Sequence, residues 1–146
     1  MKLTENFTKA EFERSETAAR HGWDNTIPTS YVNNVVNLCH VLEIIRERLN
    51  ELFIDRRVIR ITSGYRNEKL NKQVGGVENS QHTKGEAADF IVPGVPADHV
   101  YEIIKRDIDH LLIDQCILEF GQWIHLSTKL DGNNRQEFIE YEREDS

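Results

Sequence analysis

One long amphipathic run sets the strongest limit on how this chain can fold. Through residues 31–52, apolar side chains return every three or four positions, which is the period of one helix face. They are Val32, Val35, Val36, Cys39, Leu42, Ile45, Leu49 and Leu52. The other face carries Asn, Glu and Arg side chains, so we expect it to meet solvent. A helix of this length needs an apolar layer against its inner face, and the rest of the chain must supply that layer.

That layer is predicted to be a sheet formed by residues 57–142. Residues 57–62 are β-branched and alternating, and they stop at Ser63-Gly64. Further strands are expected at 87–92, 114–120, 123–128 and 136–141, with helices at 67–74 and 97–110. Thr8 and Glu11 have the spacing of a capping box, so a short helix should also begin there. The layout predicts an α+β fold with a small mixed or antiparallel sheet and N-terminal helices.

Length and composition favour one domain and exclude several function classes. The 146 residues are 38% hydrophobic, enough for a single core over 1–146, with a helical N-terminal part at 1–56 and a sheet-containing part at 57–142. Eighteen basic against 25 acidic residues give a net charge of −7, the wrong sign for following a phosphate backbone, so nucleic acid is not an expected partner. Apolar stretches of about five residues are too short to cross a membrane. We expect a monomer.

The two ends of the chain and its cysteines add little chemistry. The start lacks the apolar segment of a signal peptide, which predicts cytoplasmic synthesis. Cys39 and Cys116 fall in apolar runs and are expected to be buried free thiols. Residues 142–146 are expected to form a frayed acidic tail.

Two of the six histidines stand near a carboxylate that needs a partner. Asp89 interrupts an otherwise apolar strand, and a buried carboxylate requires a cation or strong donors. His82 lies in the polar loop before that strand, and His125 points away from the aliphatic pair Ile124 and Leu126. Two imidazoles and a carboxylate with one position left for water are typical of a hydrolytic zinc site. By spacing alone, Asp89 could instead cap a turn or pair with Arg66, while His82 is an ordinary loop histidine and His125 bonds within the sheet.

Three ordered motifs carry a family resemblance. Residues 80–89 resemble the S-x-H-x-x-G-x-A-x-D signature of the zinc D-Ala-D-Ala peptidases. Residues 63–66 are similar to that family's S-G-Y-R segment, and residues 123–125 to its W-x-H segment. The resemblance covers roughly residues 58–128, and FTKAEFERS with the long helix is similar to the lead-in of the phage-type branch. It implies the small α+β fold shared with the Hedgehog signalling domain, with zinc in a sheet-lined cleft.

Carried over residue by residue, the resemblance implies His82, Asp89 and His125 as ligands of one zinc ion. It makes Glu119 the general base, although some members place the acid three residues before the last histidine, where this chain has Gln122. A two-residue turn at Gly121-Gln122 would put Glu119 on the face away from His125, whereas an odd-length loop or a bulge would restore it. The alternative is an edge-strand acid facing solvent.

The same resemblance suggests residues that contact substrate. Arg66 would hold a substrate carboxylate through two charge-assisted bonds, or else pair with Asp89 or Glu68. Ser80 could bond the same group or cap the loop. Trp123 could wall the cleft or pack in the core. Gly85 is expected to let the loop approach the metal closely.

The sequence therefore predicts a zinc metallopeptidase of the D-Ala-D-Ala carboxypeptidase type, with residues 57–142 as its catalytic part. Its expected partner is a peptidoglycan stem peptide or a D-amino-acid dipeptide. A phage or prophage lysis enzyme that acts on the cell wall or in the periplasm after release fits the missing signal peptide, as does a cytosolic dipeptidase. Alternatives are an L-alanyl-D-glutamate endopeptidase, a non-catalytic Hedgehog-like zinc module and a plain domain without metal.

Overall fold

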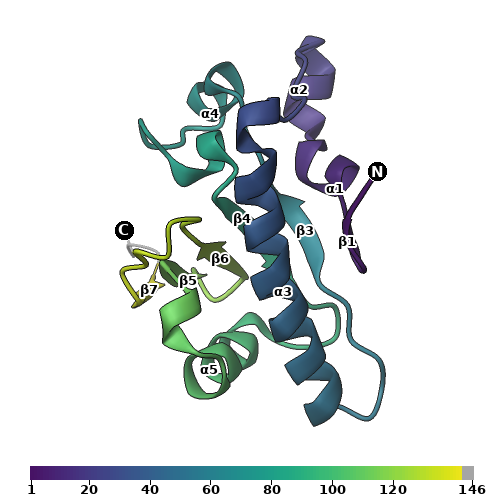
Figure 1. Cartoon of the computed structure of the whole chain (residues 1–146), viewed down its shortest axis with the longest axis vertical. Helices are drawn as coiled ribbons and strands as arrows, with labels where there is room; N and C mark the ends of the chain where they lie inside the picture. The colour runs from purple at the N-terminus through teal and green to yellow at the C-terminus, as the bar shows by residue number, and fades with distance from the viewer. Residues whose placement is uncertain (143–146) are drawn as a thin grey trace.

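The long helix lies across one face of a five-stranded sheet. A computed structural model describes residues 1–142, in which α3 (Val32–Leu52) runs along the molecule in front of the sheet (Figure 1). The strands are β3 (Arg60–Ser63), β4 (Ala87–Ile91), β5 (Gln115–Glu119), β6 (Trp123–Ser127) and β7 (Glu137–Tyr141). Their order is β3-β4-β6-β5-β7, antiparallel throughout except for the parallel pair β5-β7. The predicted α+β fold with a mixed sheet is confirmed.

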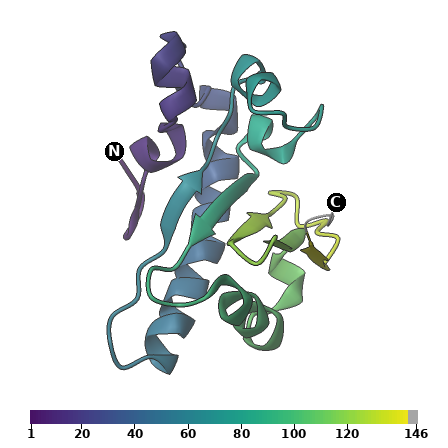
Figure 2. The ribbon, with the colours of Figure 1, turned by 180° about the vertical axis from the view of Figure 1, so that it is seen from behind.

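The core fills the space between the sheet and two helices. Alternate side chains of β4 and β6 face α3 and are fully buried, Phe90 and Leu126 among them. Helix α5 (Ala97–Asp107) packs beside α3 against β5 and β6 and buries Tyr101 and Ile104. The other face of the sheet is not covered by either helix, as the view from behind shows (Figure 2).

Short elements lie along the edge of the sheet beside β3. Strands β1 (Lys2–Thr4) and β2 (Phe7–Thr8) pair with each other, and α1 (Lys9–Glu13) starts with the predicted capping box of Thr8 and Glu11. Helix α2 (Glu16–His21), which we did not predict, is capped by Ser15. Helix α4 (Glu68–Gln73) follows β3 and is capped by Asn67.

Several predicted boundaries shift for local reasons. Strand β3 begins at Arg60 because the backbone of Arg57 exchanges two hydrogen bonds with the Asn50 side chain and so belongs to the end of α3. A 3-10 turn, η1 (Thr29–Tyr31), precedes α3, which begins without a side-chain cap. Helix α5 stops at Asp107, and η3 (His110–Leu112) is a separate 3-10 turn.

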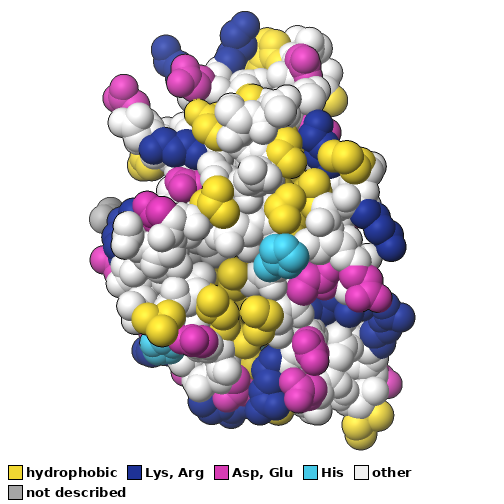
Figure 3. Space-filling model, in the orientation of Figure 1, with side chains coloured by type: hydrophobic (Ala, Val, Ile, Leu, Met, Phe, Trp, Pro, Cys, Tyr) yellow, Lys and Arg dark blue, Asp and Glu magenta, His cyan; other side chains and the backbone are white. Residues whose placement is uncertain are grey.

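Other expectations for the chain have mixed outcomes. Cys39 and Cys116 are buried free thiols, as predicted. No helix within residues 1–142 is long and apolar enough to cross a membrane. On the face shown in Figure 3, basic side chains are interspersed with acidic ones. The predicted frayed tail falls mostly on residues 143–146, which lie outside the described residues.

Candidate metal centre

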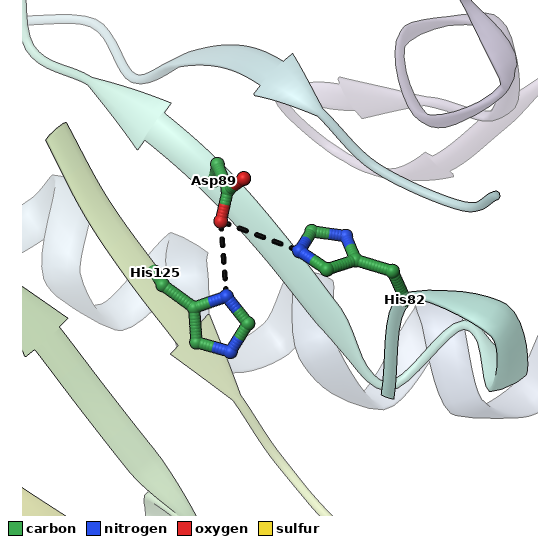
Figure 4. Close-up of side chains that lie close together, drawn as sticks. All are labelled: His82, Asp89 and His125. Carbon is green, nitrogen blue, oxygen red and sulfur yellow. Dashed lines mark hydrogen bonds and ion pairs between the residues drawn. The ribbon is translucent and has the colours of Figure 1, made fainter. Parts of the chain in front are cut away.

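Three side chains from distant parts of the chain meet on the open face of the sheet. Asp89 comes from β4, His125 from the neighbouring strand β6, and His82 from the 3-10 turn η2 (Gln81–Lys84) (Figure 4). Asp89 and His125 are direct cross-strand partners. Asp89 Oδ1 lies 3.0 Å from His125 Nδ1 and 3.3 Å from His82 Nε2.

One further hydrogen bond fixes the orientation of His82. Its Nδ1–H donates to the backbone carbonyl of Gly64 at 2.7 Å, so Nε2 is left facing Asp89. The residue is 3% exposed, and burial limits other orientations of its ring. Histidines that bind metals commonly use their second nitrogen in this way.

The Asp89 carboxylate is charged and shared between two kinds of partner. Burial alone would raise the pKa of Asp89, but hydrogen bonds from His125 and His82 bring it well below its ordinary value of 3.8. Its second oxygen, Oδ2, lies 3.6 Å from Nη2 of Arg66. The ion pair between Arg66 and Asp89, which the sequence allowed as an alternative, is therefore present. It uses Oδ2 of Asp89, so Oδ1 faces the two imidazoles.

The donor set fits a divalent metal ion. One ligand atom from each of His82, Asp89 and His125 lies within 4.8 Å of the others. Two imidazole nitrogens and a carboxylate oxygen suit zinc, with room for a fourth ligand. Within residues 1–142, one group of three or more His, Cys, Asp or Glu side chains has ligand atoms this close together, and it is this one.

Glu119 lies on the same face as this group. The connection between β5 and β6 contains three residues, Phe120 to Gln122, and places Glu119 opposite Trp123 and Ile117 opposite His125. The expected two-residue turn is therefore wrong. The odd length is possible because both Phe120 (φ 55°) and Gly121 (φ 67°) adopt left-handed backbone.

The surroundings of Glu119 differ from those of a solvent-facing acid. Strand β5 lies between β6 and β7, so the alternative of an edge-strand acid is wrong. Burial raises the pKa of Glu119, and the negative charge of Asp89 raises it further while His125 lowers it. These influences indicate that Glu119 is close enough to the centre to feel its charges.

Arg66 is held beside the centre by neutral groups as well as by Asp89. Its Nε donates to Ser63 Oγ and its Nη1 to Asn71 Oδ1, each at 3.2 Å. Asn71 is 5% exposed, and its Nδ2 donates to the carbonyl of Val77. A Cβ on Gly76 would stand 2.0 Å from Asn71 Oδ1. We did not predict this support; the available signal was the position of Asn71 next to Leu70 on the buried side of α4.

The remaining predicted residues lie close to the centre in different roles. Ser80 Oγ accepts from the backbone N–H of His82, so it caps η2. Trp123 is half-buried on the face of His125 and makes an edge contact with Phe120. Gly85 has a left-handed backbone, and a Cβ there would stand 2.7 Å from Val35 on α3. Gly85 therefore lets the loop approach the long helix closely, and the expected close approach of the loop to the metal stays a prediction.

The chain matches a known family of peptidases over a segment that includes the residues of this centre. Residues 5–127 match the family described as Peptidase M15. No curated protein matches the chain. The matched segment contains all three candidate ligands, together with Arg66 and Glu119. The chain therefore belongs to the M15 peptidases, the zinc D-Ala-D-Ala peptidase family that its three sequence motifs resemble.

Proposed function

We propose that this peptidase is zinc-dependent and hydrolyses peptidoglycan stem peptides, foremost as a D-Ala-D-Ala carboxypeptidase. The observation that carries the proposal is the convergence of His82, Asp89 and His125 on the sheet face that also presents Glu119. The proposed chemistry needs ligands for the ion and a separate carboxylate for proton transfer. The candidates for both lie on the neighbouring strands β4, β6 and β5 and on the turn η2.

The side chains of the chain divide the work. Bound by the three ligands, zinc would polarise the scissile carbonyl and lower the pKa of a bound water to about 7. Glu119 would take a proton from that water and pass it to the leaving amine, and its raised pKa suits the second of these steps. Arg66 binds and orients the substrate's carboxylate through its fork of N–H donors.

Ser80 and Trp123 complete the proposed substrate contacts. Ser80 holds η2 in place through its bond to the His82 backbone, and that hydroxyl can also donate to the substrate carboxylate. Trp123 offers an aromatic wall beside His125. Synthesis in the cytoplasm, followed by action on the wall after release as a phage or prophage lysis enzyme, is our proposal for where the reaction takes place.

Two other functions are outcomes of the same test. An L-alanyl-D-glutamate endopeptidase would use the same centre on an internal bond. A non-catalytic zinc module of the Hedgehog type would bind metal without turnover, and the position of Glu119 argues against it.

The test combines metal analysis with product identification. Purified muropeptides are digested and weighed by mass spectrometry, where loss of one terminal alanine supports the carboxypeptidase and a larger fragment supports the endopeptidase. His82→Ala, Asp89→Ala and His125→Ala should lose both zinc and activity. Glu119→Gln should keep zinc and lose turnover, and an active Glu119→Gln would contradict its assigned role. A zinc-loaded protein that leaves every muropeptide intact would refute the enzymatic proposal.

A further inference from the structure

A second group of arginines lies beside the candidate centre, along the edge strand β3. A groove of about 620 Å³ lies between β3, α4 and the segment that joins α1 to α2, and its wall includes Arg14, Arg60 and Arg66. Glu16 is the acidic side chain in the same wall. Three guanidinium groups against one carboxylate give the groove a positive charge in a chain whose net charge is −7. The groove is therefore a local exception to the charge of the protein.

These guanidinium groups are available to a ligand to different degrees. Arg66 already faces Asp89. Arg14 is exposed and reaches the backbone carbonyl of Ile61 at 3.3 Å, which leaves its other donors open. Arg60 is exposed, and within residues 1–142 no hydrogen bond or ion pair of its side chain is found. Arginine without a carboxylate partner beside a groove is a donor for an incoming anion.

Strand register places Arg60 on the same face as the centre. Arg60 pairs with Ile91, and Ser63 pairs with Asp89, so Arg60 and Asp89 both project from the open face. Ile91 in turn stands beside Trp123, since Phe90 pairs with Ile124 on the strand beyond. Arg60 and Asp89 lie on neighbouring strands and are offset by two residues along them, so their Cα atoms are about 8 Å apart.

The distance between Arg60 and Asp89 determines which part of a bound peptide could reach Arg60. An extended peptide advances about 3.4 Å per residue, so a chain bound at the centre would carry its group two or three residues from the scissile bond past Arg60. A carboxylate there would meet unpaired guanidinium donors. The volume of the groove is ample for such a segment.

We propose that the groove along β3 is a second anion subsite, in which Arg60, supported by Arg14, binds a substrate carboxylate two or three residues from the scissile bond. The subsite selects acidic peptides over their amidated forms. It rests on the proposed function, because the scissile bond is placed by the metal centre.

The test compares two forms of one synthetic stem peptide. Both end in D-Ala-D-Ala and contain a D-Glu residue, whose free carboxyl is intact in one and amidated in the other. The wild-type protein should show a KM about five to ten times lower for the acid than for the amide, with similar kcat. Arg60→Gln should reduce this ratio to about one by raising KM for the acid alone. High salt should also reduce the wild-type ratio.

Two matched variants control for charge. Arg56→Gln removes an exposed arginine outside the groove and should leave the ratio unchanged. Glu16→Gln removes the acid within the groove and should increase the ratio. An Arg60→Gln protein with the wild-type ratio would overturn the subsite while leaving the peptidase intact.

A binding measurement separates this proposal from the proposed function. If the wild-type protein cleaves neither peptide, calorimetry with each peptide measures the affinity ratio directly. Preference for the acid that disappears in Arg60→Gln then supports the subsite without turnover. Equal affinities of the wild-type protein for acid and amide would overturn it.

Discussion

Replacing Gly76 by alanine should disturb Arg66 mainly through its hydrogen-bond partner Asn71. The new Cβ would stand 2.0 Å from Oδ1 and 2.7 Å from Cγ of Asn71, far inside contact distance, whereas Nη1 of Arg66 would be 3.1 Å away. Asn71 is buried, so its amide must move away from both of its partners, the Arg66 guanidinium and the Val77 carbonyl. Gly76 does not have a left-handed backbone, so the effect is steric.

The size of the effect follows from the bonds that break. A hydrogen bond to a charged group contributes about 2 kcal/mol and a neutral one about 1 kcal/mol, so Gly76→Ala should lower the free energy of unfolding by about 3 kcal/mol. For a chain of this length that is a fall in Tm of roughly 9 °C. Gly75→Ala is the matched control. Its Cβ would meet nothing within 4 Å, and its φ of +77° limits the cost to about 1 kcal/mol.

A double-mutant cycle tests the contact itself. In an Asn71→Ala background the added methyl has no amide to displace, so Gly76→Ala should cost about 2 kcal/mol less than in the wild type. Denaturant titration gives the four free energies of unfolding. Costs that add to within about 0.5 kcal/mol would refute the steric reasoning. In assays on a substrate with a free terminal carboxylate, Gly76→Ala should raise KM through Arg66.

Three shorter predictions concern the centre and the fold around it. Removing metal with a chelator should lower Tm, because the ligands bind the ion in the folded state alone; an unchanged Tm would argue against a resident metal. Arg66→Ala should raise KM for substrates with a free terminal carboxylate and have little effect on amidated ones; unchanged kinetics would remove it from the site. Burial would raise the pKa of Asp114, but bonds from Arg135 lower it overall, so its contribution to stability is present above its ordinary 3.8 and is lost as pH falls through the lower folded value. Acid titration of unfolding should therefore show a shallower loss in Asp114→Asn than in the wild type.

The sequence predicted the elements that have a local signal. The period of residues 31–52, the capping box at Thr8 and the carboxylate within the apolar strand at Asp89 are each visible in a few neighbouring residues. The same is true of the three candidate ligands, since their motifs are short and ordered. These features needed no knowledge of how distant segments pack.

The features that the sequence did not settle depend on register and on packing. The side of the sheet on which Glu119 lies depends on one residue of loop length. The left-handed backbone of Phe120 that this loop uses is uncommon for a bulky side chain. The role of Gly85 depends on α3, about fifty positions earlier in the chain. The bond between Arg66 and Asn71 depends on how α4 packs against the loop that follows it.

The parallel pairing of β7 with β5 has a consequence for any shortened form of the protein. The match to the family ends at residue 127, ten positions before β7 begins, so a fragment trimmed to that match would lack this strand. The backbone amides and carbonyls of β5 would then be open along one side, ready to recruit a strand from another molecule. Such a fragment should self-associate, and it would do so directly beside Glu119.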